Sequence, residues 1–261
     1  MTSPPAFDAM GPDAARVYNH LRGGKDWLPP DRELAERLKA ICPPITDMIG
    51  ANEIYLGFAA MQARDAGVRQ FLDLGGGFPA AGSVRDIAQA RDPDARVVTV
   101  DWSDDVADPV TGYGPLLEYW GVTGAAVVQA DIADPRKVLA DPGLTGLIDL
   151  GEPVALIFGL VLHSMEPQRA REVVAGFVSE VAWGSLVAVT VARGCGDEAF
   201  GQARKEWEAG TGSHAEEFSL DDVTALLGGL EVRGEVGPVT GPRLAGPCVK
   251  PHIAGGIARK L

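Results

Sequence analysis

The chain has 261 residues, of which 46% are hydrophobic, and a formal net charge of −13. This length and composition suit one α/β domain with an appendage, and the acidic balance excludes a general nucleic-acid binder because no run of Lys or Arg offsets it. Neither an apolar stretch of about 18 residues nor a basic segment followed by an apolar core is present, so we expect a cytoplasmic protein without a membrane partner.

The cysteine and histidine content does not indicate a metal site. Cys42, Cys195 and Cys248 are far apart, and the chain has no Cys-x-x-Cys pair and no cluster of histidines. This spacing matches neither zinc ligands nor a disulfide framework. We therefore expect no bound metal and three buried thiols in a reducing compartment.

Residues 1–67 are expected to form a helical cap or lid over the ligand site. A short amphiphilic helix ends at paired glycines, the first of which is Gly23. Apolar residues at helical spacing predict a second helix over residues 31–41, with Asp31 as its N-cap. A third, longer helix is predicted to run to about residue 66, with Thr46 as its cap.

Residues 68–261 are expected to form a Rossmann-like ligand-binding domain. Apolar runs alternate with helical segments, and five strands are predicted, over residues 69–74, 96–101, 125–130, 153–163 and 185–191. The run at 153–163 lacks period-two alternation, as expected for a strand covered on both faces. The alternation predicts an α/β fold with a parallel, doubly wound sheet and right-handed crossovers.

The end of the chain predicts an antiparallel edge for this sheet. A helix capped by Ser219 ends at Gly228, and strand candidates follow at residues 230–236 and 252–259. Two strands joined by a turn rich in Pro and Gly bring the total to a seven-stranded, mainly parallel sheet with an antiparallel C-terminal edge strand. Residues 194–218 are polar and are interpreted as an insertion that forms part of a pocket wall.

The first predicted strand ends in an acid and a glycine cluster, namely Asp73, Gly75, Gly76 and Gly77. The second strand ends in another acid, Asp101, 24 residues after Gly77. Glycines at such a turn allow a ligand to approach the backbone closely, and a carboxylate at the neighbouring strand tip can accept hydrogen bonds from both ribose hydroxyls. Pro79 disfavours a pyrophosphate site, so the pattern favours a nucleoside without phosphates, such as S-adenosylmethionine. An ordinary glycine-rich turn is the alternative.

Several motifs resemble those of a known family, the actinobacterial S-adenosylmethionine-dependent methyltransferase-like proteins first described as a domain of unknown function. They are Ala-Arg-Val-Tyr-Asn-x-Leu-x-Gly-Gly-Lys-Asp at residues 15–26, Asn-x-x-Tyr-Leu at 52–56, Gln-Phe-Leu-Asp-Leu-Gly-x-Gly-x-Pro at 70–79 and Ala-Arg-Val-Val-Thr-Val-Asp at 95–101. The resemblance covers roughly residues 12–192. It implies a class I methyltransferase-like Rossmann fold and S-adenosyl-L-methionine as the cofactor.

The chain departs from the family pattern on the side where an acceptor would bind. Trp102 and the acids after it replace the family's Asn-Asp-Pro-Val-Val, and Thr190 begins a segment that replaces its Ser-His. A Trp-Arg-Pro motif is absent around residues 239–243. We therefore expect a retained cofactor site and a changed acceptor site.

The resemblance and the motif together assign cofactor contacts to individual residues. The acid and glycines of the turn are expected at the methionine part, and Asp101 at the ribose. Trp102 is expected to stack on the adenine, with Asp131 and Ile132 at its amino group. Lys25 and Asp26 are expected to close over the cofactor. The alternative for Trp102 is a half-buried tryptophan at the surface, and the alternative for Asp131 is an exposed loop residue. For Lys25 and Asp26 the alternative is a solvated pair.

Two residues are candidates for the chemistry itself. His163 follows the fourth strand, at the edge where open α/β sheets bind ligands, and a histidine can act as a general base near neutral pH. A structural histidine is the alternative. Tyr18, from the leader motif, is expected to close over the cofactor carboxylate or sulfonium.

The leading hypothesis is a methyltransferase that acts on a small-molecule substrate, with specialised metabolism as its setting. One alternative uses the same sulfonium differently, by intramolecular displacement to a cyclic amino acid with release of methylthioadenosine, or by cyclisation of a substrate. Another is a non-catalytic module that binds S-adenosylmethionine. No nucleic-acid or membrane partner is expected, and a homodimer is left open.

Overall fold

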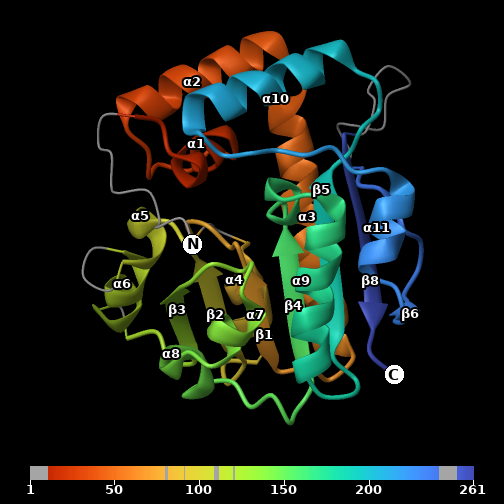
Figure 1. Ribbon diagram of the computed structural model, residues 1–261. Helices are drawn as coiled ribbons and strands as arrows, with labels where there is room; N and C mark the ends of the chain where they lie inside the picture. The colour runs from red at the N-terminus through yellow and green to blue at the C-terminus, as the bar shows by residue number, and fades with distance from the viewer. Residues whose placement is uncertain (1–10, 80–81, 91, 109–111, 120, 241–251) are drawn as a thin grey trace.

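The computed structural model describes residues 11–79, 82–90, 92–108, 112–119, 121–240 and 252–261, and a single mixed sheet runs through it (Figure 1). Among these residues the sheet has eight strands in the order β3-β2-β1-β4-β5-β8-β6, with β7 also paired to β8. The strands are β1 (Gln70–Leu74), β2 (Arg96–Asp101), β3 (Ala125–Gln129), β4 (Val154–Gly159), β5 (Leu186–Ala192), β6 (Glu231–Val232), β7 (Gly237–Pro238) and β8 (Ile253–Arg259).

The predicted fold class is confirmed, with one more strand than expected. Strands β1 to β5 are parallel, and β8 runs antiparallel to β5. The single strand predicted over residues 230–236 contains only β6, and β7 follows directly after it; both are antiparallel to β8. Gly234 lies between them with a φ of +84°, and this left-handed conformation interrupts an extended strand.

The parallel register brings the carboxyl ends of three strands to the same edge of the sheet. Leu74 of β1 is paired with Val100 of β2 and with Phe158 of β4. Every residue of β4 except Gly159 is buried, as its unbroken apolar sequence predicts. Asp73, Asp101 and the loop after β4 therefore meet at the carboxyl edge of the sheet.

Helices cover both faces of the sheet. One face is covered by α3 (Ile45–Asp65) and α4 (Val84–Gln89), whose alanines and valine pack on β1, β2 and β4. The other face carries the helices α7 (Pro135–Leu139), α8 (Pro142–Thr145), α9 (Pro167–Glu180) and α11 (Leu220–Leu226). Two short helices, α5 (Asp104–Ala107) and α6 (Tyr113–Tyr119), follow β2.

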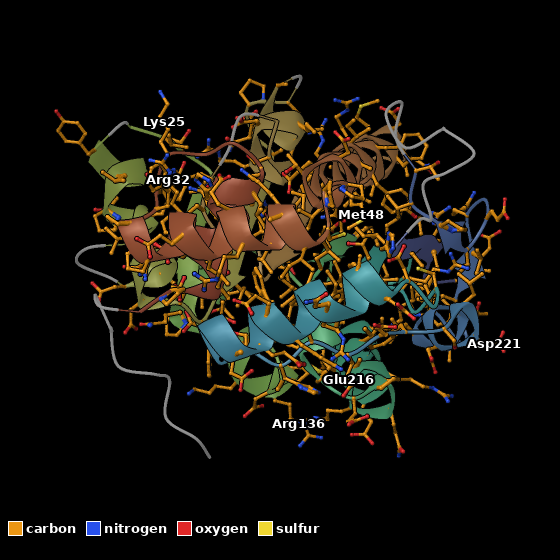
Figure 2. All side chains as sticks on the ribbon, turned by 90° about the horizontal axis from the view of Figure 1, so that it is seen from above. Lys25, Arg32, Met48, Arg136, Glu216 and Asp221 are labelled. Carbon is orange, nitrogen blue, oxygen red and sulfur yellow. The ribbon has the colours of Figure 1, made fainter. Side chains whose placement is uncertain are left out.

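A third group of helices lies above the carboxyl edge of the sheet (Figure 1). It consists of α1 (Ala14–Leu21), α2 (Pro29–Ile41) and α10 (Glu198–Thr211), and α2 and α10 run side by side (Figure 2). An ion pair between Arg37 and Glu206 joins these two helices at 2.8 Å. The first three helices therefore have different positions: α1 and α2 lie above the sheet edge, while α3 packs on a face. The division into residues 1–67 and 68–261 remains a prediction.

Two predicted helix starts are wrong, and proline explains both. Helix α2 begins at Pro29, so Asp31 is not its N-cap but lies in its first turn, where its buried carboxylate accepts a hydrogen bond from the Leu28 amide at 2.6 Å. Helix α3 begins at Ile45 directly after Pro44, one residue before the expected cap Thr46. The fixed φ of proline suits the first turn of a helix, where Pro29 lies, and Pro44 has a helical backbone conformation at the N-cap of α3.

The predicted thiol environments are confirmed only in part. Cys42 is buried, whereas Cys195 is half-buried in the segment before α10, and Cys248 lies outside the described residues. Within the part of the chain that the structure describes, no helix has the length and apolar character that crossing a membrane requires.

Candidate functional site

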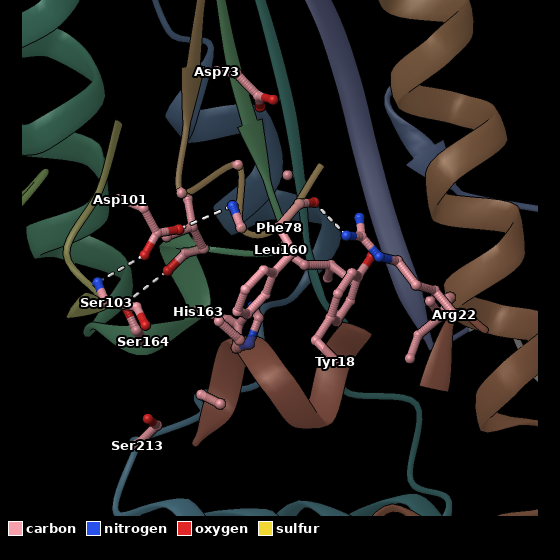
Figure 3. A pocket seen from close by; sticks show the side chains of 18 of the residues that line it. Tyr18, Arg22, Asp73, Phe78, Asp101, Ser103, Leu160, His163, Ser164 and Ser213 are labelled. Carbon is pink, nitrogen blue, oxygen red and sulfur yellow. Dashed lines mark hydrogen bonds between the residues drawn. The ribbon is translucent and has the colours of Figure 1, made fainter. Parts of the chain in front are cut away.

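A cavity of about 770 Å³ opens at the carboxyl edge of the sheet, beneath α1, α2 and α10. Its lining includes most of the residues singled out in the sequence, namely Tyr18, Asp73, Gly75, Gly76, Gly77, Asp101, Trp102, Asp131, Ile132 and His163. Figure 3 shows Asp101, Phe78, Tyr18 and His163 around this space. Lys25 and Asp26 are exposed and do not line the cavity, so the structure does not bring them together with the others.

The glycine turn after β1 has a conformation that other residues would not accept. Gly75 has a φ of +74°, and a Cβ built there would lie 2.4 Å from Cγ2 of Val161. A Cβ at Gly76 would lie 2.7 Å from the carboxyl carbon of Asp73. Gly77 has a φ of +62°, but a Cβ there would meet no protein atom within 4 Å. A side chain at Gly75 or Gly76 would therefore clash with other protein atoms, whereas a side chain at Gly77 would project into the cavity.

Asp101 connects the glycine turn to the tip of β2. Its Oδ2 accepts a hydrogen bond from the Gly77 amide, and its Oδ1 accepts one from the Ser103 amide, both at 2.9 Å. Burial raises the pKa of Asp101, and these bonds oppose the rise. A carboxylate offers about four acceptor positions, so two are available for a pair of hydroxyl groups.

Asp73 is a second acid of the cavity, and its environment is unusual. Burial, followed by the charges of Glu53 and Asp101, raises the pKa of Asp73 to about 7, while Arg22 lowers it. A cation placed beside Asp73 would therefore favour its ionised form. This arrangement suits the recognition of an ammonium group.

The raised pKa of Asp73 predicts that the free protein loses stability as the pH rises from about 4 to about 7. In this window the folded state holds a proton that the unfolded state has released, so deprotonation favours unfolding. We expect a decrease on the order of 2 kcal/mol, reduced from the full shift because Asp73 is only half-buried.

Denaturant unfolding at pH 5 and pH 8 measures this difference. Asp73→Asn should flatten the dependence and stabilise the protein at pH 8, whereas the exposed control Asp94→Asn should keep the wild-type slope. An unchanged slope in Asp73→Asn would show that this carboxyl does not titrate as described.

Arg22 lies over the glycine turn, although no sequence motif singled it out. Its Nη2 donates to the backbone carbonyl of Phe78 (Figure 3), and its Nη1 lies 3.8 Å from Oε2 of Glu53. Oδ1 of the buried Asn19 accepts hydrogen bonds from Nε and Nη2 of Arg22 at 3.0 and 2.9 Å. The leader motif thus holds a guanidinium against the loop that follows β1.

Other residues of the leader motif hold Asn19, and through it Arg22, in position. Nδ2 of Asn19 donates to the backbone carbonyl of Asp26 at 3.2 Å, and a Cβ at Gly24 would lie 2.1 Å from Oδ1 of Asn19. Gly24 therefore leaves room for the asparagine. Asp26, which was expected at the cavity, instead contacts the residue that orients Arg22.

Tyr18 and Glu53 form a hydrogen-bonded pair in the cavity wall. The Tyr18 hydroxyl donates to Oε1 of Glu53 at 2.8 Å and accepts from Nδ2 of Asn52 at 3.1 Å. Burial and the Glu53 charge raise the pKa of Tyr18 well above its ordinary value. The hydroxyl is therefore a neutral donor. Glu53 was missed because only the fold brings α3 next to the leader helix.

The expected adenine contacts lie at the other end of the cavity, near β2 and β3. Trp102 is 43% exposed, which leaves its ring open to a stacking partner. Asp131 is exposed, and its Oδ1 accepts from the Ala133 amide at 2.8 Å. Ile132, the next residue after Asp131, is buried.

His163 lies in a 3-10 turn, η1 (Leu162–Ser164), after β4. Its Nδ1 is buried and has no hydrogen-bond partner among the residues that the structure describes. Burial, with a smaller contribution from His214, lowers the pKa of His163 to about 4, so the ring is neutral at neutral pH and accepts a proton only weakly.

The backbone of Leu160, just before η1, has an unusual conformation. Its φ is +48°, and hydrogen bonds from its amide to the carbonyl and hydroxyl oxygens of Thr190 hold it there. This left-handed conformation of a leucine indicates strain at the cavity wall.

The half of the cavity near α10 is mostly apolar. Its walls come from α3, α10 and the loop after β4, with the side chains of Met48, Ile49, Leu160, Phe200, Ala203 and Trp207. Arg204 also lines it, but Nη1 of Arg204 bonds Glu208 at 3.1 Å and the Ala215 carbonyl at 2.7 Å. The sequence-based view of residues 194–218 as a pocket wall therefore agrees with their position.

One group of side chains in the described part of the chain has the spacing of a metal site, namely Glu166, His214 and Glu216, and two of the three are exposed. His214 already pairs with Glu216 at 2.5 Å and with Glu208 at 3.3 Å. These contacts are those of an ordinary ion-pair cluster, and we assign no metal to it. The expectation of no metal remains a prediction.

Comparison with known proteins agrees with the geometry. The sequence profile of the S-adenosyl methyltransferase family matches residues 1–241. A crystal structure from Thermobifida fusca, designated a methyltransferase, shares 29% identity with a TM-score of 0.84 and covers 98% of both chains. A domain-of-unknown-function protein of Streptomyces avermitilis shares 26% identity with a TM-score of 0.83, over 96% of this chain and 98% of that one.

A more distant solved structure shows the same fold. Magnesium protoporphyrin IX methyltransferase from Synechocystis, with bound S-adenosylhomocysteine, shares 13% identity and a TM-score of 0.56 over 94% of this chain and 93% of that one. No curated protein sequence matched this chain. The profile match over nearly the whole length identifies the chain as a member of the S-adenosyl methyltransferase family, with S-adenosylmethionine as its cofactor.

Proposed function

We propose that the protein transfers the methyl group of S-adenosylmethionine to a small-molecule acceptor held in the apolar half of the cavity. The observation that carries this proposal is Asp101, a buried carboxylate bonded to the Gly77 amide beside a cavity of about 770 Å³, which is large enough for two ligands. Specialised metabolism and a cytoplasmic location remain predictions, as does a homodimer.

The proposal assigns the nucleoside to the end of the cavity formed by β1, β2 and β3. Asp101 would accept hydrogen bonds from the ribose hydroxyls through its remaining acceptor positions. Trp102 would lie against the adenine, and Asp131 with Ile132 would border its edge. The exposure of Trp102 and Asp131 in the free protein supports these roles, because both can be reached by a ligand.

The methionine end would be recognised as a zwitterion. Arg22, which donates to the carbonyl of Phe78 just after the glycine turn, suits the carboxylate, whereas Asp73 and Glu53 suit the ammonium group. Gly77 leaves open space along the backbone for the chain between them. Opposite charges on the two sides of the turn thus match the opposite charges of an amino acid.

The protein's contribution to the reaction would be alignment and exclusion of water. The bound cofactor supplies an electrophilic methyl group on a sulfonium. The helices α1, α2 and α10 cover the cavity, and the loop after β4 presents Leu160 and His163 to it. Holding an acceptor in line with the methyl carbon is the main requirement for such a displacement.

Arg22→Ala is expected to weaken the binding of S-adenosylhomocysteine about tenfold, because one charge-assisted contact contributes roughly 1.5–3 kcal/mol and solvent replaces part of it. Asn19→Ala should cause a smaller loss by releasing Arg22 from its two bonds. Calorimetric titration measures both. The exposed arginine of α2, Arg32→Ala, is the control and should leave the affinity unchanged; equal effects of Arg22→Ala and Arg32→Ala would remove Arg22 from the site.

The function itself is tested with methyl-labelled S-adenosylmethionine and a fractionated metabolite extract from the source cells. The expected result is label in a small molecule, with one S-adenosylhomocysteine formed for each methyl group transferred. Release of methylthioadenosine from the cofactor alone would contradict methyl transfer and indicate intramolecular displacement. Binding without any turnover in all fractions would favour a non-catalytic module.

A further inference from the structure

The acceptor half of the cavity differs in charge and chemistry from the cofactor half. Phe200 and Trp207 of α10 face the cavity together with Met48 and Ile49 of α3, and Leu160 joins them from the loop after β4. These side chains offer aromatic and aliphatic surface rather than hydrogen bonds. Such walls favour a flat, largely apolar ring system.

The cavity does not offer an unpaired cation to an acidic acceptor. Among the described residues the lining arginines are Arg22, Arg85 and Arg204. The proposed function assigns Arg22 to the cofactor carboxylate, and the other two already have carboxylate partners, Asp86 at 2.7 Å and Glu208 at 3.1 Å, respectively. A carboxylate or phosphate on the acceptor would have to displace one of these partners or remain buried without a counter-ion. Either outcome is costly, so the pairing excludes anionic acceptors.

The side chains near the acceptor half are also poorly arranged to remove a proton. His163 carries a buried Nδ1 without a partner in the described part of the chain and accepts a proton only weakly. The Tyr18 hydroxyl donates to Glu53. Both ring nitrogens of His214 already contact carboxylates, Nδ1 at 3.3 Å from Glu208 and Nε2 at 2.5 Å from Glu216. The ring of His252 stacks on Phe200 with centroids 4.5 Å apart, and its Nε2 lies 3.3 Å from Asp197.

We infer that the acceptor is an uncharged, largely apolar ring compound that reacts through a lone pair already present at neutral pH, such as a neutral nitrogen. This inference rests on the proposed function and adds the class of acceptor. The nitrogen lone pair forms the new N–CH3 bond as the C–S bond breaks, and its electron pair leaves on the sulfur of S-adenosylhomocysteine. The product nitrogen carries the positive charge, or releases a proton to water where it bears one.

The test uses protein saturated with S-adenosylhomocysteine and two probes that share a flat, fused bicyclic ring, the uncharged quinoline and the anionic naphthalene-2-carboxylate. Calorimetric titration should show that quinoline binds at least tenfold more tightly. Equal or tighter binding of the carboxylate would overturn the inference about charge. Failure of both probes to bind the loaded protein would overturn the inference about an apolar ring.

A matched pair of tryptophan variants places the binding in the cavity. Trp207→Ala should weaken quinoline binding at least tenfold while leaving the affinity for S-adenosylhomocysteine unchanged. The control is Trp183→Ala, because Trp183 is 73% exposed before β5, at the opposite edge of the sheet, and should affect neither ligand. Equal quinoline affinity in Trp207→Ala and wild type would overturn the assignment. If the wild-type protein did not bind S-adenosylhomocysteine at all, the proposed function itself would be refuted.

Discussion

Replacing Asp101 by Ala is expected to weaken the binding of S-adenosylhomocysteine by at least about 100-fold. The carboxylate would accept both ribose hydroxyls while it fixes the Gly77 amide, and bonds to a charged group contribute roughly 1.5–3 kcal/mol each. A 100-fold weaker affinity corresponds to a loss of about 3 kcal/mol in binding free energy. This is less than the full contribution of two such bonds, because water replaces part of it. Asp101→Asn should have an intermediate effect, since one amide oxygen still accepts a hydrogen bond.

Titration calorimetry on the folded variants measures this change, with circular dichroism as the check on folding. Asp94→Ala is the matched control, because Asp94 is exposed just before β2, whose other end carries Asp101. Burial raises the pKa of Asp101, so removing the charge relieves a desolvation cost that offsets the lost bonds to the Gly77 and Ser103 amides, and Asp101→Ala should remain folded. An affinity within threefold of the wild type would exclude Asp101 from the nucleoside site.

Gly77→Ala is expected to abolish measurable cofactor binding with only a small loss of stability. The positive φ of Gly77 costs an alanine roughly 1–2 kcal/mol, but the added methyl group meets no protein atom within 4 Å. That space belongs to the cavity, so the methyl group would exclude the methionine part of the ligand. We expect the affinity to fall by at least about 100-fold, or 2.7 kcal/mol by conversion.

Gly75→Ala provides the contrast for this prediction. Its methyl group would lie 2.4 Å from Cγ2 of Val161, so the main effect is a loss of stability of about 2–3 kcal/mol or more. Val161→Ala in the same chain should restore part of it. Thermal unfolding measures stability, and calorimetry measures affinity. Gly50→Ala, in α3, adds a methyl group where there is space and should leave the affinity unchanged. If Gly77→Ala bound S-adenosylhomocysteine normally, the ligand would not approach this part of the turn.

Local patterns were sufficient to predict most of the sheet. The strands β1, β2 and β4 are apolar runs that end in glycine or acid, and their place in the order follows from alternation with helices. The two short edge strands were not separable in the sequence, because their extent depends on pairing with β8 and on the conformation of Gly234. The starts of α2 and α3 were predicted one or more residues too late, because the polar residues Asp31 and Thr46 were taken as N-caps and the preceding prolines were not.

The site was predictable where one short segment supplies the residues. Asp73, the glycines and Asp101 belong to a single β-α-β unit, so their proximity follows from topology. Glu53 and Arg22 come from separate helices, and only the tertiary structure brings them to the turn. The leader motif reaches the cavity through Tyr18 and Arg22, whereas Lys25 and Asp26 do not line it.

The most direct test is a crystal structure of the protein with S-adenosylhomocysteine. The account predicts ribose hydroxyls within hydrogen-bonding distance of Asp101, the amino acid end between Arg22 and Asp73, and the sulfur facing the side chains of Phe200 and Trp207. Density for the ligand elsewhere, or an empty cavity at saturating ligand, would contradict it.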